Sequence, residues 1–86
     1  MKELSWRKNA WNDYISWQSE DNKTLKKINL LINDILRNPF EGIGKPEALR
    51  NKLSGLWSRR IDEYNRLVYL VEDAHIVIFS CKNHYE

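Results

Sequence analysis

The stretch RLVYLVEDAHIVIFSCK, residues 66–82, decides the fold of this 86-residue chain. It holds two runs rich in β-branched and aromatic residues, RLVYLVED (66–73) and HIVIFSCK (75–82), which meet at a short polar break. This is the pattern of two antiparallel strands joined by a hairpin. LWSRRID, residues 56–62, has the same character and lies just upstream. We therefore expect a three-stranded antiparallel meander.

Before the meander, the apolar spacing changes from that of a strand to that of a helix. Residues 3–6, ELSW, alternate in polarity and predict a short strand. A first helix follows, whose spacing is set by Trp11, Tyr14, Ile15 and Gln18. Trp11, Tyr14 and Trp17 could stack on nucleotide bases, as aromatics do in single-strand binders. At helical spacing, however, we expect them to pack in the core.

A second helix is predicted after residues 20–22, EDN. Asp21 and Asn22 offer capping side chains at its start. Asn38-Pro39 ends it, because the residue before a proline is pushed out of the helical region. Its apolar stripe consists of Leu25, Ile28, Ile32, Ile35 and Leu36.

The remaining segment, PFEGIGKPEALRNKL (39–53), links the second helix to the meander. Gly42 and Gly44 predict a bend-rich loop over residues 39–46, followed by a short turn of helix over 46–53. The element order is therefore β-α-α-β-β-β. We expect one α+β domain over residues 1–86, in which two N-terminal helices pack on an antiparallel sheet.

Charge is unevenly distributed along the chain. Residues 23–66 carry ten Lys and Arg against five Asp and Glu, a balance of +5, whereas the rest carries four against seven, a balance of −3. The basic middle favours a polyanionic partner, although short basic clusters are also ordinary solvated surfaces.

Other features narrow the functional class. Residues 1–4 lack the apolar stretch of a signal peptide, and the longest apolar run, LVYLV, is far too short to span a bilayer, so we expect a cytoplasmic protein with no membrane partner. The single cysteine, Cys81, cannot form an intramolecular disulfide and is expected to be a small buried hydrophobe. No metal site and no cofactor are expected.

Residues 38–71, NPFEGIGKPEALRNKLSGLWSRRIDEYNRLVYLV, together with the closing His84-Tyr85, resemble the YoeB/Txe toxins of bacterial toxin-antitoxin pairs, in the RelE superfamily. The resemblance covers nearly the whole chain. It implies an RelE-like fold and an mRNA endonuclease that works in the A site of a translating ribosome. It also implies a cognate antitoxin of the YefM/Axe kind, with operator DNA bound only through the antitoxin complex. It leaves open whether the toxin is a monomer or a homodimer.

The resemblance also assigns roles to four residues. Cleavage by the ribose 2′-hydroxyl needs a base, a cation for the phosphate oxygens and an acid for the leaving oxygen. Glu47 matches the family's general base, Arg66 its phosphate-stabilising arginine and His84 its general acid, while Tyr85 matches the residue that orients or stacks the substrate. Each has an ordinary alternative: Glu47 as a first-turn helix residue, Arg66 as a surface ion-pair partner, and His84 as a solvated tail residue.

RNA-phosphate contacts are expected from the basic loop and the strand that follows it. Arg59 and Arg60 alternate in direction along a regular strand, so at most one of them faces the site, and we place Arg59 on that side. The chain also ends with Glu86, whereas family members commonly stop at the tyrosine. The expected phosphate-binding residues are Lys45, Arg50, Lys52, Arg59 and Arg60.

Two other functions remain open at this stage. A toxin of the same fold could inhibit a topoisomerase by binding, like the ParE branch, or the chain could be a non-catalytic RNA-binding module. The combination of Glu47, Arg66 and His84 favours cleavage, because ParE-type chains lack this acid-base set and a simple binder does not need it.

Overall fold

The protein is described here by a computed structural model that covers residues 2–83. Five strands and two helices follow one another along the chain, with a 3-10 turn at Asn51–Leu53 before the third strand. The elements are β1 (Glu3–Trp6), α1 (Lys8–Glu20), α2 (Asn22–Arg37), β2 (Glu47–Ala48), β3 (Leu56–Arg60), β4 (Arg66–Val71) and β5 (His75–Ser80).

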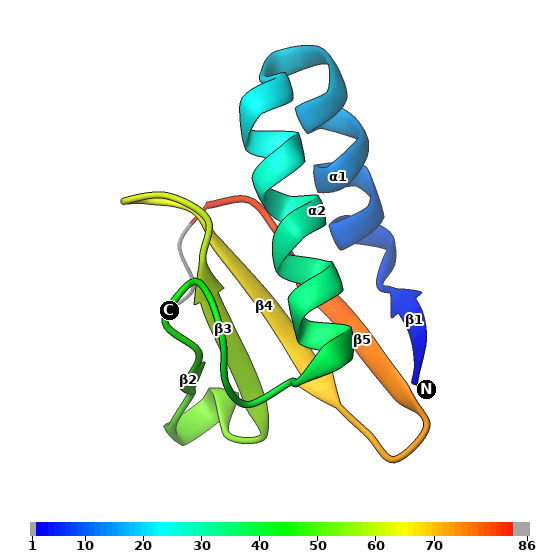
Figure 1. Cartoon of the computed structure of the whole chain (residues 1–86), viewed down its shortest axis with the longest axis vertical. Helices are drawn as coiled ribbons and strands as arrows, with labels where there is room; N and C mark the ends of the chain where they lie inside the picture. The colour runs from blue at the N-terminus through cyan, green and yellow to red at the C-terminus, as the bar shows by residue number, and fades with distance from the viewer. Residues whose placement is uncertain (1, 84–86) are drawn as a thin grey trace.

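The strands form one sheet in the order β1-β5-β4-β3-β2, and the α1–α2 hairpin covers one of its faces (Figure 1). The predicted meander is confirmed, since β3 pairs antiparallel with β4 and β4 with β5. The sheet is antiparallel from β5 to β2, as expected, but β1 joins it parallel to β5. Alternating polarity over four residues predicts a strand, but it does not determine whether the strand pairs parallel or antiparallel with its neighbour. For β1 this depends on the path of the chain through the α1–α2 hairpin and the meander.

The boundaries of α2 agree with the sequence pattern. The Asp21 carboxylate accepts hydrogen bonds from the backbone N–H groups of Lys23 and Thr24, which satisfies two donors that a helix start leaves unpaired. The helix ends at Arg37, one residue before Asn38-Pro39. Both ends are therefore determined by local chemistry rather than by distant contacts.

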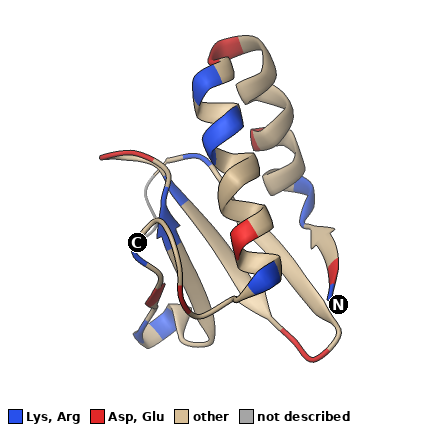
Figure 2. Cartoon of the chain, viewed as in Figure 1, with Lys and Arg blue, Asp and Glu red and all other residues tan. Residues whose placement is uncertain are grey.

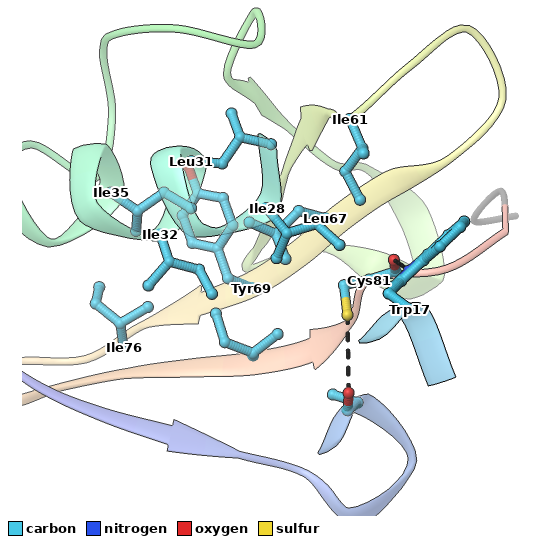
Figure 3. Packing of buried hydrophobic residues seen from close by; sticks show 12 residues of the cluster. Trp17, Ile28, Leu31, Ile32, Ile35, Ile61, Leu67, Tyr69, Ile76 and Cys81 are labelled. Atoms are coloured by element: carbon cyan, nitrogen blue, oxygen red, sulfur yellow. Dashed lines mark hydrogen bonds between the residues drawn. The ribbon is translucent and has the colours of Figure 1, made fainter. Parts of the chain in front are cut away.

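The core lies between α2 and the sheet (Figure 3). Ile28, Leu31 and Ile35 of α2 are fully buried, as are Ile76 and Ile78 of β5. Burial of side chains of this size contributes about 1.5–3 kcal/mol each. The predicted place of the first-helix aromatics is confirmed for Trp17, which is buried; Trp11 is 46% exposed, and Tyr14 is partly buried.

Cys81, directly after β5, is fully buried, as predicted. Burial raises the pKa of its thiol to about 12, because the thiolate would lose its hydration, and the Asp13 carboxylate adds to this shift. The thiol donates a weak hydrogen bond to the carbonyl of Ala10 in α1 (Figure 3). Within residues 2–83, none of the helices is long and apolar enough to cross a membrane.

The segment from Pro46 to Leu53 is only in part the turn of helix that the sequence predicted, since Asn51–Leu53 form a 3-10 turn but the residues before them are not helical. Glu47 and Ala48 form β2, paired with Ser58 and Trp57 of β3. Asn51 has a φ of 58°, which is incompatible with continuing a right-handed helix. Pairing with an available sheet edge outweighed a weak local preference for helix.

Arg59 is the largest fully buried side chain in the described part of the protein. Its two Nη atoms donate to the Asp34 carboxylate and to the carbonyl oxygens of Asn38, Glu41 and Ile43. Its Nε donates to the hydroxyl of Tyr69. A guanidinium has five N–H donors, so the geometry gives each donor an acceptor. The charge is paired and the loop that follows α2 is held against β3.

Gly42 allows this loop to pass beside the ion pair. A Cβ atom at Gly42 would lie 1.9 Å from Oδ2 of Asp34 and 3.0 Å from Nη1 of Arg59. Its φ of 133° is also a conformation that other residues rarely adopt. The glycine that the sequence marked only as a bend is therefore required by the packing around Arg59.

Substitution of Asp34 by alanine is expected to lower the free energy of unfolding by about 3–5 kcal/mol, because it leaves a buried guanidinium without its counter-charge. Urea denaturation measures the change. The matched control is Asp73→Ala, an exposed aspartate in the β4–β5 turn, which should change stability by no more than about 0.5 kcal/mol. Equal effects of the two substitutions would contradict the structural role of the buried pair.

The same pair should show in the acid stability. The hydrogen bond from Arg59 lowers the pKa of Asp34, assisted by the N–H of Ile43. A carboxyl with a lowered folded-state pKa contributes stability above its unfolded value of about 3.9 and loses it as the pH falls through the folded value. Asp34→Ala should therefore lose less stability than the wild-type protein on acidification below about pH 4, as measured by urea midpoints.

Candidate nucleic-acid interface

The sheet face away from the helices gathers the predicted chemical groups, since residues directly opposite one another on neighbouring strands share a face. Glu47 of β2 lies opposite Ser58 of β3, and Arg60 of β3 lies opposite Arg66 of β4. Ser58 and Arg60 are two residues apart on one strand and therefore point to the same side. Glu47, Arg60 and Arg66 thus belong to one face, which we call the open face.

Strand geometry sets the spacing of these groups. Glu47 and Arg66 are separated by two strand steps across the sheet and two residues along it. Their Cα atoms therefore lie about 12 Å apart. A glutamate and an arginine can both extend toward a ligand of phosphodiester size over that distance. Glu47 is exposed and Arg66 is half-buried.

Arg66 is positioned by the β3–β4 turn. Its Nη1 donates to the carbonyl oxygens of Asp62, at 3.0 Å, and Asn65, at 3.2 Å. Asp62 in turn accepts hydrogen bonds from the backbone N–H groups of Tyr64 and Asn65. Burial raises the pKa of Asp62, but hydrogen bonds from Asn65 and Tyr64 and the charge of Arg66 outweigh it, so the net shift of the pKa is downward. An ionised Asp62 therefore keeps the turn closed around Arg66.

The segment after β5 is tied to the same place. The backbone N–H of Arg66 donates to the carbonyl of Asn83, and the N–H of Asn83 donates to the side chain of Asn65. On the other side, Trp17 donates to the carbonyl of Cys81, and Lys82 donates to Glu20. Residues 81–83 are therefore held between α1 and β4. His84, Tyr85 and Glu86 lie outside the described residues.

A shallow pocket opens beside the end of β3. Its cations are Lys27, Lys45 and Arg60, and Ile61 contributes apolar surface. Figure 2 shows basic residues in the first half of α2, around β2 and where the end of β3 meets the start of β4, and others at the end of α2 and near the N-terminus. Lys27 was not predicted as a binding residue. Nothing in the sequence around Lys27 indicates that Lys45 and Arg60 fold next to this part of α2. The pocket is lined by Lys27, Gly44, Lys45, Arg60, Ile61, Asp62 and Glu63.

The prediction that Arg59 binds RNA was wrong. Its side chain is 0% exposed and all its donors are used inside the protein. The alternation of Arg59 and Arg60 was correctly inferred, but the assignment of faces was reversed. Arg60 is the exposed member of the pair. The sequence could not decide this, because the partner that buries Arg59 is Asp34, 25 residues away.

The other predicted binding residues remain accessible. Lys45, Arg50 and Lys52 are all exposed, the first in the loop before β2 and the others around the 3-10 turn. Lys45 has a φ of 53°, in the left-handed region. Of these three, Lys45 lies beside Arg60 in the pocket, and cations grouped in this way are suited to phosphate oxygens.

Among residues 2–83, no group of three or more His, Cys, Asp and Glu side chains is arranged to hold a metal ion. His75, the histidine within this range, begins β5, and its Nε2 lies 3.3 Å from a carboxylate oxygen of Glu3. This places it with β1 rather than with Glu47 and Arg66.

Comparisons with known proteins show the family to which this chain is similar. Residues 6–85 match the family model of the YoeB-like toxin of bacterial type II toxin-antitoxin systems. The chain is 54% identical to Toxin YoeB of Escherichia coli K12 over 82 residues, which is 95% of this chain and 98% of that protein.

Solved structures give the same result. A YoeB/ParE toxin from Agrobacterium tumefaciens superposes with a TM-score of 0.94 at 41% identity, covering 96% of this chain and 99% of that one. YoeB of Staphylococcus aureus, solved as a dimer, superposes with a TM-score of 0.90 at 49% identity, covering 98% of each chain. In a heterotetrameric complex with YefM, the same toxin gives 0.89 at 49% identity, covering 99% of each chain.

Substitution of Arg60 by glutamine is expected to weaken binding of single-stranded RNA and to flatten its salt dependence. Each phosphate contact contributes about 0.7 to the slope of log affinity against log salt for a single strand. Fluorescence anisotropy of a labelled oligonucleotide from low to moderate salt measures the slope. Lys8→Gln, which removes an exposed cation at the start of α1, is the matched control and should leave the slope unchanged.

Proposed function

Since this chain belongs to the YoeB-like toxin family of bacterial type II toxin-antitoxin systems, we propose that it is an endoribonuclease that cuts mRNA in the A site of the translating ribosome and thereby inhibits translation. The observation that carries the proposal is the strand register, which sets Glu47 and Arg66 on the sheet face away from the helices. The described residues end at Asn83, whose carbonyl accepts a hydrogen bond from the backbone N–H of Arg66.

The chemistry assigned to the site is internal attack by the ribose. Glu47 takes the proton from the 2′-hydroxyl, whose oxygen then bonds to the adjacent phosphorus. Arg66 stabilises the charge that develops on the phosphate oxygens. The bond from phosphorus to the 5′ oxygen breaks and His84 donates a proton to that oxygen, which leaves a 2′,3′-cyclic phosphate and a 5′-hydroxyl. Tyr85 orients the substrate.

The environments of the two described residues suit these roles. Glu47 is exposed on a two-residue strand at the sheet edge, where a ribose can approach it. Arg66 has its Nη1 bound to the β3–β4 turn, so its guanidinium is held in place before substrate arrives. Such preorganisation is the main source of electrostatic catalysis. Lys45, Arg50, Lys52 and Arg60 hold the RNA backbone around this centre without reading its sequence.

A nuclease of this kind needs an inhibitor, and we propose a cognate antitoxin of the YefM kind. The structure of the S. aureus relative is that of a complex with YefM. In this chain, the balance of +5 over residues 23–66 favours an acidic segment that folds on binding. Homodimerisation is likewise proposed from the S. aureus dimer. DNA binding is assigned to the antitoxin complex and not to this chain alone.

A 2′-deoxy nucleotide placed at the scissile position of an mRNA is expected to abolish cleavage by this protein on purified ribosomes, because the attacking hydroxyl is absent. The unmodified mRNA should give a fragment ending in a 2′,3′-cyclic phosphate. Primer extension and end-group analysis measure both results. Continued cleavage at the deoxy position would rule out the mechanism, and no cleavage of any mRNA would leave ParE-like inhibition or simple RNA binding in its place.

Loss of Glu47 and loss of Lys45 should affect different kinetic constants. Glu47→Ala removes the general base and is expected to lower the saturating single-turnover rate about 10²- to 10⁴-fold. Lys45→Gln removes a peripheral cation, so its rate should recover as the enzyme concentration is raised. Glu72→Ala, an exposed carboxylate in the β4–β5 turn, is the control and should cleave as the wild type does. Recovery of the Glu47 variant at saturation would reduce Glu47 to a binding role.

Removal of residues 84–86 is expected to abolish cleavage while weakening antitoxin binding only modestly, because most of the interface area would lie on the helices and the sheet edge. Isothermal titration calorimetry with the cognate antitoxin measures the affinity, and circular dichroism confirms the fold. Loss of affinity in a folded truncation would make the chain end the principal anchor of the antitoxin.

A further inference from the structure

We propose that Arg59 is a positioning residue for the open face: it anchors loop 38–46 and thereby places Glu47, without contacting RNA. This inference rests on the proposed function, because Glu47 is the proposed general base. It assigns to a buried arginine next to the exposed Arg60 a role that differs from phosphate binding.

The anchor joins one side chain to most of the loop. Arg59 donates to the carbonyl oxygens of Asn38, at 2.7 Å, and of Glu41 and Ile43, both at 3.1 Å. The Tyr69 hydroxyl, which accepts from Nε of Arg59, donates to the carbonyl of Pro39 at 2.7 Å. The carbonyl groups of four of the six residues from 38 to 43 are thus bound to Arg59 or to its partner.

The Asp34 carboxylate closes the anchor from the helix side. It accepts from Arg59 and also from the backbone N–H of Ile43, at 3.0 Å. The loop is therefore held through both its donors and its acceptors. A single ammonium group could not do this, because only the guanidinium fork directs five donors to acceptors in different directions.

Only a short length of chain separates the part of the loop bonded to Arg59 from Glu47 on the open face. Gly44 directly follows the last anchored residue, and its carbonyl accepts from the N–H of Arg60 at 2.6 Å. Glu47 lies three residues further, in a strand of two residues. The anchored loop therefore constrains the backbone that leads into this strand. A displacement of about 1 Å at a reacting group can lower a rate about 100-fold.

The first variant is Arg59→Lys, which keeps a positive charge beside Asp34 but cannot reach all five acceptors. The second is Gly42→Ala, whose Cβ atom would collide with Asp34 without altering any charge. If Arg59→Lys does not fold, Gly42→Ala carries the same test. The control is Ile76→Ala, which truncates a fully buried side chain of β5; Ile76 pairs with Leu4 of β1 and Val71 of β4, at the other end of the strand order from β2.

Two measurements are made on each variant. Amide hydrogen exchange by NMR compares the N–H groups of Ile43 and Arg60, which report on the loop, with those of the β4–β5 ladder, which report on the whole fold. Single-turnover cleavage at saturating programmed ribosomes gives the rate and the concentration for half-maximal cleavage.

In the Arg59 and Gly42 variants, the loop amides should exchange at least about 10-fold faster relative to the ladder amides. The saturating rate should fall about 10- to 100-fold with little change in the half-saturating concentration. In Ile76→Ala, all amides should accelerate together and the saturating rate should equal that of the wild type.

Uniform acceleration of all amides in the Arg59 and Gly42 variants would overturn the proposal, since Arg59 would then only stabilise the fold. Selective opening of the loop with an unchanged saturating rate would overturn it as well. If the wild-type protein cleaves no mRNA, the proposed function fails separately. The anchoring of the loop is then decided by exchange alone, and it stands only if the loop amides open selectively.

Discussion

The buried guanidinium of Arg59 is the interaction on which the rest of this structure depends. A cation with no exposed surface must be paired and fully hydrogen-bonded, or its burial would cost several kcal/mol. Asp34 supplies the counter-charge from α2, Tyr69 one acceptor from β4, and the loop after α2 three carbonyl oxygens. The requirement to satisfy one side chain therefore joins the helical layer, the sheet and the loop.

Arg59 and Arg60 are neighbours on β3, but alternation along the strand points their side chains to opposite faces of the sheet. Arg59 faces the helices and organises the interior, while Arg60 lies opposite Arg66 on the open face. The loop bonded to Arg59 continues directly into the segment that carries Lys45 and Glu47. The buried hydrogen bonds of Arg59 are therefore connected through the backbone to the proposed RNA-cleaving face. The chain after β5 is bonded to the start of β4 and to the β3–β4 turn, through Asn83, Arg66 and Asn65.

The sequence predicted most elements because their signals are local. The stripe of α2, the Asp21 cap, the stop at Asn38-Pro39 and the meander all depend on neighbouring residues. The direction of β1 depends on pairing with β5 at the other end of the chain, and the strand at Glu47–Ala48 exists only because β3 offers a sheet edge, so neither could be predicted from local pattern. For the site, the resemblance named Glu47 and Arg66, and the register brings them to one face. Arg59 was assigned to the wrong face. Alternation shows that Arg59 and Arg60 point to opposite faces of the sheet, but it does not show which of the two faces the helices cover.

The most direct test of this account is an NMR titration of the arginine side chains with an RNA analogue that carries 2′-deoxy nucleotides and so resists cleavage. The account predicts that the guanidinium protons of Arg59 exchange slowly with water and that their signals do not move as the analogue is added. The signals of Arg60 and Arg66 should shift together at the same analogue concentration. A shift of Arg59 with unchanged Arg60 and Arg66 would contradict both the proposed interface and the interior role of Arg59.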